Sequence, residues 1–119
     1  MIKIELTKEH RGGPKSTTFS GRPEGESVRL ALDLSKLDKG EDQVSISIPE
    51  DTTSFNPSFF MGLFFESVKK LGSVERFKNK YLLDLSNFSD DLKQYILEDF
   101  EDCFRRCSNE LNKKTGIDL

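Results

Sequence analysis

The side chain best placed to do chemistry in this sequence is a serine that follows a proline at the start of a Phe-rich segment. Ser58 comes after Asn56 and Pro57, at the end of a polar turn spanning residues 51–58. Proline is favoured at the first position of a helix and asparagine at the N-cap, so the pattern predicts a helix that begins at Pro57. Free N–H groups at a helix start suit an anion or a phosphorylated hydroxyl. Ser58 is therefore our candidate phosphoacceptor, and the competing interpretation is a serine that only hydrogen-bonds within its own turn.

The predicted helix over residues 57–71 carries two apolar faces. At the α-helical pitch one stripe consists of Phe60, Met61, Phe64, Val68 and Leu71. Phe59 and Leu63 form a flanking ridge that one core face need not cover. We expect this ridge to lie near solvent and, together with Asn56 and Pro57, to bind a protein partner.

Length and charge limit the classes of function that remain. The 119 residues fit one domain, 1–119, and the net charge of −3 opposes generic binding to nucleic acid. No apolar run approaches the roughly 20 residues that a membrane helix needs, and the amino terminus lacks the pattern of a signal region. We therefore expect a cytoplasmic protein without a nucleic-acid or membrane partner.

The amino-terminal third is locally basic and rich in glycine. Arg11, Arg22 and Arg29 are candidates for binding an anion, and the competing interpretation is a solvated loop. His10 in this segment has no serine or cysteine nucleophile in a recognisable motif. This part of the sequence predicts no hydrolase.

The remaining reactive side chains also favour structural roles. Cys103 and Cys107 lie one helical turn apart, which makes a disulfide between them geometrically unfavourable and predicts buried free thiols. A metal would need further ligands nearby, and His10 is distant in sequence. The acidic residues of the last helix are interpreted as a solvated face. Glu50, Asp51 and Asn56 are a further candidate for a ligand site, at the carboxyl end of a strand. We expect no enzyme, no metal and no cofactor.

The elements follow from hydropathy patterns and from turn residues. Strands are predicted at 1–6, 43–48 and 81–85, with a short return strand at 16–19 beside the first. Helices are predicted from within 20–26 to Gly40, over 57–71, and from a cap at Asn87 or Ser89 onward, with 112–119 as a flexible tail. This order predicts an α/β fold: a mixed, mostly parallel sheet of about four strands, with three main helices largely on one face.

The order of elements resembles the STAS domain, the fold of bacterial anti-sigma-factor antagonists. The local match is the segment 55–63, Phe-Asn-Pro-Ser-Phe-Phe-Met-Gly-Leu. In that family the turn typically reads Asp-Ser-Ser or Asp-Ser-Thr followed by Gly-Leu, and its phosphorylated residue falls where Ser58 stands. Asn56 then takes the Asp position and Pro57 the first Ser position.

The chain is also similar to a divergent STAS-like family of unknown function. That likeness lies in Ser20-Gly21, in Gly25-Glu26, in Arg29 and in the Ser58-Phe59 step. The resemblance implies a bacterial-type, non-catalytic regulatory domain that docks a partner through the strand-to-helix turn and is switched by phosphorylation. The implied partner is a kinase-like or anti-sigma-type regulator, and a homodimer is also compatible. The alternative is a small-ligand or nucleotide-binding domain that uses the same turn and the basic loop.

Overall fold

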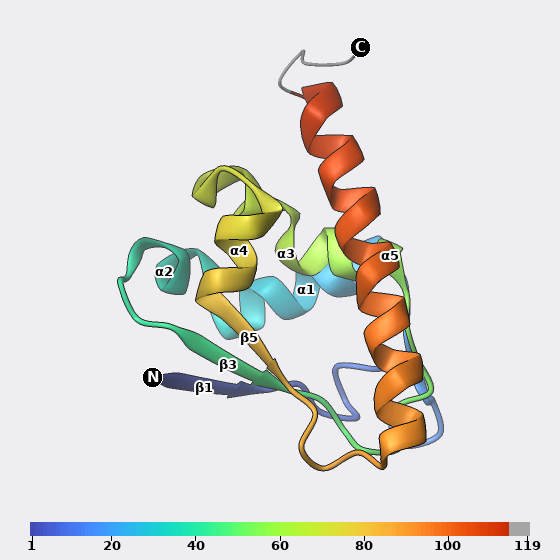
Figure 1. Ribbon diagram of the computed structural model, residues 1–119. Coiled ribbons are helices and arrows are strands. Elements are labelled where there is room, and N and C mark those ends of the chain that lie inside the picture. The colour runs from blue at the N-terminus through green and yellow to red at the C-terminus, as the bar shows by residue number, and fades with distance from the viewer. Residues whose placement is uncertain (115–119) are drawn as a thin grey trace.

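The structure is a computed structural model that describes residues 1–114, and it has an α/β architecture (Figure 1). Its elements in chain order are β1 (Ile2–Glu5), β2 (Thr18–Phe19), α1 (Arg22–Leu32), α2 (Leu34–Lys39), β3 (Val44–Ser47), β4 (Ser54–Phe55), α3 (Pro57–Leu71), α4 (Val74–Lys80), β5 (Tyr81–Asp84) and α5 (Asp90–Lys114). The predicted α/β class with mostly parallel pairing is confirmed, because every strand pair in this part of the chain is parallel.

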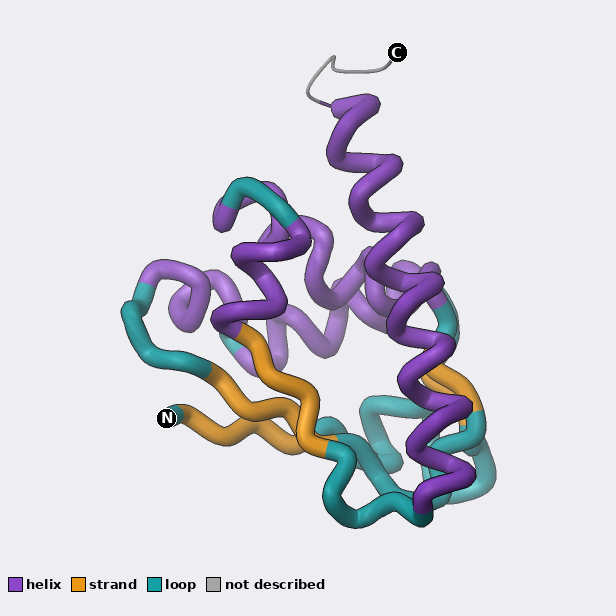
Figure 2. Tube along the Cα trace, viewed as in Figure 1, coloured by secondary structure: helices purple, strands orange, loops and turns teal. Residues whose placement is uncertain are grey.

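The larger sheet has the order β1-β3-β5. Ile4 pairs with Ile46 and Ile46 with Leu83, so these apolar side chains share one face of the sheet. Helices α1 to α4 lie over one side of this sheet (Figure 2). The alternate residues Lys3, Ser45 and Leu82 share the opposite side, which carries polar side chains except at Leu82 in this row.

The predicted position of the second strand was wrong. Instead of returning beside β1, Thr18 pairs with Ser54 and Phe19 with Phe55 in a separate two-stranded parallel sheet. Residues 51–58 were expected to form a single turn, so β4 was not predicted. Two residues are too few to give a period-2 pattern, which explains why β4 could not be recognised.

The predicted helix that ends at Gly40 is divided into two. Asp33 adopts φ 51°, in the left-handed region, and its N–H donates to the carbonyl oxygen of Leu30. Aspartate tolerates this conformation better than most residues, so α1 ends there and α2 leaves in a new direction. The break buries Leu34 completely and turns Asp38 of α2 toward the core.

The segment 74–80 also differs from the prediction, which assigned it no regular structure. It forms α4, with Ser73 as N-cap: the Ser73 Oγ accepts a hydrogen bond from the Arg76 N–H at 3.1 Å. Val74 and Phe77 of this short helix are buried. Its two apolar anchors are too few for a helical stripe, but the serine cap was a readable signal.

Helix α3 ends at Leu71, as predicted, and Gly72 closes it with φ 104°. Ser89, one of the two predicted caps of the last helix, accepts at its Oγ from the Leu92 N–H at 3.4 Å. The predicted tail is wrong for 112–114, which continue α5, and 115–119 lie outside the described residues. Leu92 is 39% exposed, so the buried stripe of α5 begins one turn later, at Ile96.

Candidate functional site

The turn before α3 is closed by its own side chains. The Asn56 Oδ1 accepts hydrogen bonds from the Ser58 N–H at 2.8 Å and from the Ser58 hydroxyl at 2.7 Å. Pro57 occupies the first turn, where its missing N–H removes no helix hydrogen bond. The predicted helix start at Pro57 and the predicted N-cap at Asn56 are therefore both confirmed. Asn56 is exposed and Ser58 is half-buried.

Ser58 also joins this turn to a second one. Because β2 and β4 pair in parallel and each leads directly into a helix, the starts of α1 and α3 lie side by side. The Gly21 N–H donates to the Ser58 Oγ at 3.2 Å, and Gly21 has φ 93°, a conformation that glycine adopts readily. One hydroxyl therefore connects the two strand-to-helix turns, 20–21 and 56–58.

An aromatic cluster lies directly behind these turns. The rings of Phe19, Phe55 and Phe59 pack with centroid separations of 5.1 Å, 5.1 Å and 5.4 Å, and all three side chains are essentially inaccessible to solvent. Phe19 and Phe55 come from the two short strands, and Phe59 follows Ser58 in α3. A change at Ser58 is thus one residue away from the core.

The expectation that Phe59 and Leu63 lie near solvent was wrong. Both side chains are 0% exposed. Helix α1 crosses α3 on the side where the ridge was placed, so α3 is buried on almost every side. Neither residue can contact a partner directly while the domain keeps this fold.

The crossing of α1 and α3 depends on two glycines whose packing role was not predicted. Gly25 of α1 faces the backbone of α3 at Phe59, and Gly62 of α3 faces the backbone of α1 at Arg22. Glycine inside a helix costs stability relative to alanine, so its presence in both helices is a signal of close packing. This signal could have identified the second buried face of α3.

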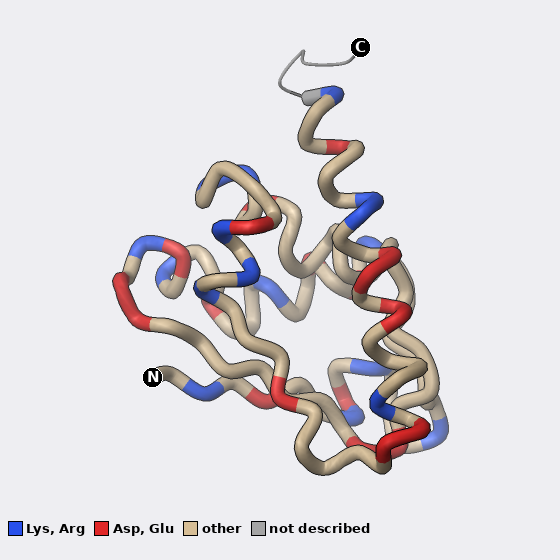
Figure 3. The backbone as a smooth tube through the Cα atoms, in the orientation of Figure 1, with Lys and Arg blue, Asp and Glu red and all other residues tan. Residues whose placement is uncertain are grey.

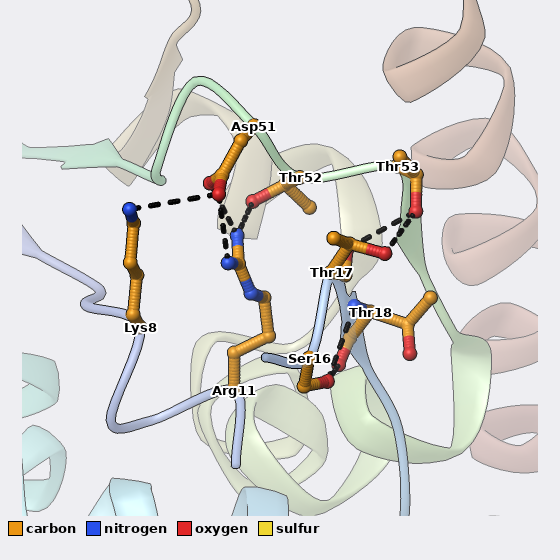
Figure 4. Close-up of polar contacts among 8 residues, drawn as sticks. All are labelled: Lys8, Arg11, Ser16, Thr17, Thr18, Asp51, Thr52 and Thr53. Atoms are coloured by element: carbon orange, nitrogen blue, oxygen red, sulfur yellow. Dashed lines mark hydrogen bonds and ion pairs between the residues drawn. The ribbon is translucent and has the colours of Figure 1, made fainter. Parts of the chain in front are cut away.

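The acidic turn after β3 is held by a buried arginine (Figure 4). Arg11 is 4% exposed, and its guanidinium donates to both carboxylate oxygens of Asp51, at 2.8 Å and 3.2 Å, and to the Thr52 hydroxyl at 2.9 Å. Lys8 also approaches Asp51, at 3.6 Å. The hydrogen bond from Arg11 holds the pKa of Asp51 below its ordinary value. Arg11 therefore fastens the amino-terminal loop to this turn.

The loop and the turn meet a second time beside this ion pair. The Thr53 hydroxyl donates to the Thr17 hydroxyl at 2.8 Å, and the Thr53 N–H donates to the Thr17 carbonyl oxygen at 2.8 Å (Figure 4). Together with Arg11 these bonds align β2 with β4. Asp51 and Thr53 thus position the two helix starts instead of forming an open ligand site with Asn56.

Arg29 belongs to a different cluster, beneath α2. Its guanidinium donates to the Ser67 hydroxyl and to a carboxylate oxygen of Asp38, each at 2.7 Å, and to the Leu63 carbonyl oxygen at 3.0 Å. Asp38 is buried and also accepts from the Tyr81 hydroxyl at 2.5 Å. Burial and this bond raise the pKa of Tyr81. These residues were not predicted together, because they come from four separate elements.

The three candidate anion-binding arginines do not converge. Arg11 is engaged by Asp51 and Arg29 by Asp38, while the Arg22 guanidinium lies 5.8 Å from the centre of the Phe65 ring. Basic and acidic residues are interspersed along the described chain (Figure 3). The structure therefore provides no cradle built from these three side chains.

The remaining reactive groups lie in structural positions. Cys103 and Cys107 are free and fully buried, and burial raises the pKa of the Cys107 thiol to about 12. The predicted free buried thiols are confirmed. Asp99 was expected on a solvated face, but its carboxylate accepts from the Phe55 N–H at 2.9 Å, which ties α5 to the end of β4.

Residues 1–114 contain no cluster of three or more His, Cys, Asp or Glu side chains with the geometry of a metal site. No helix in the same range combines the length and the apolar character that crossing a membrane requires. Comparisons with protein-family models, with curated proteins and with solved structures each returned no match. The STAS resemblance rests on the short motifs given above.

Proposed function

We propose that this chain is a non-catalytic, STAS-like regulatory domain that binds a protein partner through its paired strand-to-helix turns and releases it when Ser58 is phosphorylated. The observation that carries the proposal is the double engagement of the Ser58 hydroxyl. Its oxygen accepts from Gly21 in one turn, and its proton is donated to Asn56 in the other. A chemical change at this one atom alters both turns together.

The phosphorylation step has a defined local effect. A kinase transfers the γ-phosphoryl group of ATP to Ser58 Oγ, with ADP and the hydroxyl proton as the other products. The ester oxygen can no longer donate to Asn56 Oδ1, and a group carrying about −1.5 to −2 charges then lies beside that acceptor. The helix N–H groups favour the phosphate, but Asn56 and Gly21 must move to accommodate it. The surface presented to the partner changes accordingly.

The partner surface in this proposal differs from the one suggested by the sequence. It consists of Ser20, Gly21, Asn56, Pro57 and Ser58. Asn56 and Ser20 are exposed, while the other three are half-buried. Phe59 and Leu63 take no part as contacts and act only as the rigid support behind the turns. The resemblance to anti-sigma-factor antagonists suggests a kinase-like regulator as the partner.

The alternative, a small-ligand or nucleotide-binding domain, finds less support. It requires a basic cradle near the turn, and Arg11 and Arg29 already satisfy carboxylates of this chain. A thermal-shift measurement with ATP and GTP tests this alternative. Stabilisation that survives Asn56→Ala but is lost in Arg22→Ala would favour it over the partner-binding proposal.

The direct test combines intact-mass measurement with affinity capture from lysate of the native cell. With ATP present, we expect the wild type to gain one phosphoryl group, Ser58→Ala to gain none, and Ser35→Ala, at an exposed serine of α2 outside the partner surface, to behave as wild type. Ser58→Asp and Asn56→Ala should lose the captured partner while keeping the wild-type unfolding midpoint within a few degrees. Phosphorylation confined to another residue, or capture that neither variant affects, would contradict the proposal.

A further inference from the structure

A shallow apolar groove lies on the outer side of the crossing between α1 and α3. Its volume is about 190 Å³, and Met61 and Phe65 of α3 are among the apolar side chains that line it. Leu30 of α1 stands at its rim and is 81% exposed, the highest value for a large apolar side chain in the described part of the chain. The same small patch therefore carries both a protruding apolar side chain and an apolar hollow.

The charges around this groove are balanced. Arg22 and Glu26 of α1 line it, as do Arg29 of α1 and Glu66 of α3. Arg29 is paired with Asp38 and Glu66 with Lys69, so the rim charges that remain are one cation, Arg22, and one anion, Glu26, and the net charge is zero. A surface of this composition does not repel a copy of itself, whereas a rim of one sign would.

We infer that this face binds a second copy of the chain in an isologous, two-fold contact. In such a contact the same patch is used by both copies, so a protrusion and a hollow must occur side by side on one surface. Leu30 of each copy would enter the groove of the other above Met61 and Phe65. Arg22 and Glu26 of one rim would meet charges of opposite sign on the other.

This inference can be tested separately from the proposed role of Ser58. Leu30 lies nine residues beyond Gly21 along α1, more than two helical turns from the paired turns, although Arg22 and Met61 bring the other end of the groove close to them. Leu30 and Ser58 are thus at opposite ends of this face. Variants at Leu30 and at Ser58 therefore report on different contacts, and either proposal can fail without the other.

Sedimentation velocity over a range from low micromolar to submillimolar protein tests the inference. We expect a monomer–dimer equilibrium in the wild type, and Leu30→Ser to raise the dissociation constant about tenfold or more, because the apolar contact occurs twice. Leu97→Ser, at a 42% exposed leucine of α5, is the matched control and should dimerise as wild type. Urea unfolding should show that neither exposed substitution disrupts the fold.

Reversal of single rim charges provides a second, independent test of the two-fold contact. Glu26→Arg makes the rim cationic and Arg22→Glu makes it anionic, so each variant alone should dimerise more weakly than wild type. An equimolar mixture of the two should associate more tightly than either one. A wild type that stays monomeric throughout, a dimer that Leu30→Ser leaves unchanged, or a Leu30→Ser effect confined to capture of a different protein would each overturn the inference.

Discussion

Gly25 of α1 and Gly62 of α3 each lie against the backbone of the opposite helix. A Cβ atom on Gly25 would stand 2.2 Å from the carbonyl oxygen of Phe59, and one on Gly62 would stand 2.1 Å from that of Arg22. Neither neighbour is a side-chain end that could rotate away. The close approach of the helices, and hence the alignment of their N-terminal turns, depends on both positions lacking a side chain.

We therefore expect Gly62→Ala to lower the free energy of unfolding by about 1 to 3 kcal/mol, because the added Cβ forces α1 and α3 apart. Alanine is otherwise the better helix former, so the sign of the change is informative. Urea unfolding provides the measurement. Gly40→Ala is the control: a Cβ there meets only the Leu37 carbonyl oxygen at 3.6 Å, and we expect little change or a slight gain. Equal effects at the two glycines would contradict the role of the crossing.

Phe59 is expected to behave as a core residue. Phe59→Ala removes a fully buried ring that contacts both Phe19 and Phe55, which should cost about 3 to 5 kcal/mol of unfolding free energy. Leu97→Ala on exposed α5 surface should change it by less than about 0.5 kcal/mol. A loss below about 1 kcal/mol at Phe59, accompanied by loss of partner capture, would restore the ridge as a docking surface.

The sequence was sufficient where a pattern extended over several residues. The alternation in 43–48 and in 81–85 identified β3 and β5, and the Asn56-Pro57 step placed the start of α3. Residues that share a regular period experience the same environment, so their burial can be read without knowledge of the fold.

The sequence was insufficient where structure depends on contacts between distant segments. The pairing of Thr18 with Ser54 and the bond from Gly21 to Ser58 join residues 36 and 37 positions apart, and neither leaves a local pattern. The burial of Phe59 and Leu63 likewise depends on where α1 crosses α3. Only the internal glycines, Gly25 and Gly62, carried a local sign of that crossing.

The ion pair between Arg11 and Asp51 should appear in the acid titration of the protein. Because the folded-state pKa of Asp51 is depressed, the pair contributes stability above the ordinary pKa of about 4, and that contribution is lost as the pH falls through the lower, folded value. Carboxyl NMR titration should place the pKa of Asp51 below ordinary in the wild type. In Arg11→Met it should return toward the ordinary value, and the loss of stability on acidification should become shallower. A pKa of Asp51 that is equal in both proteins would contradict the pairing.

Tyr81 and Asp38 should respond at the opposite end of the pH scale. The buried Tyr81 hydroxyl donates to Asp38, and Tyr81→Phe leaves that carboxylate oxygen without its donor, so we expect a loss of about 1 to 3 kcal/mol at neutral pH. The folded-state pKa of Tyr81 is raised, mainly by burial. Its contribution is therefore complete below the ordinary pKa of about 10 and is lost as the pH rises from there through the folded value.

Alkaline absorbance of the Tyr95→Phe variant measures this titration without interference, because Tyr81 and Tyr95 are the only two tyrosines in the sequence. We expect no phenolate signal until the pH is well above 10, or until the protein unfolds. Tyr95 is 66% exposed, so its replacement should itself change the free energy of unfolding by less than about 0.5 kcal/mol. Phenolate formation near pH 10 in the folded protein, together with an unchanged stability of Tyr81→Phe, would show that the Asp38 cluster does not hold α2 against β5.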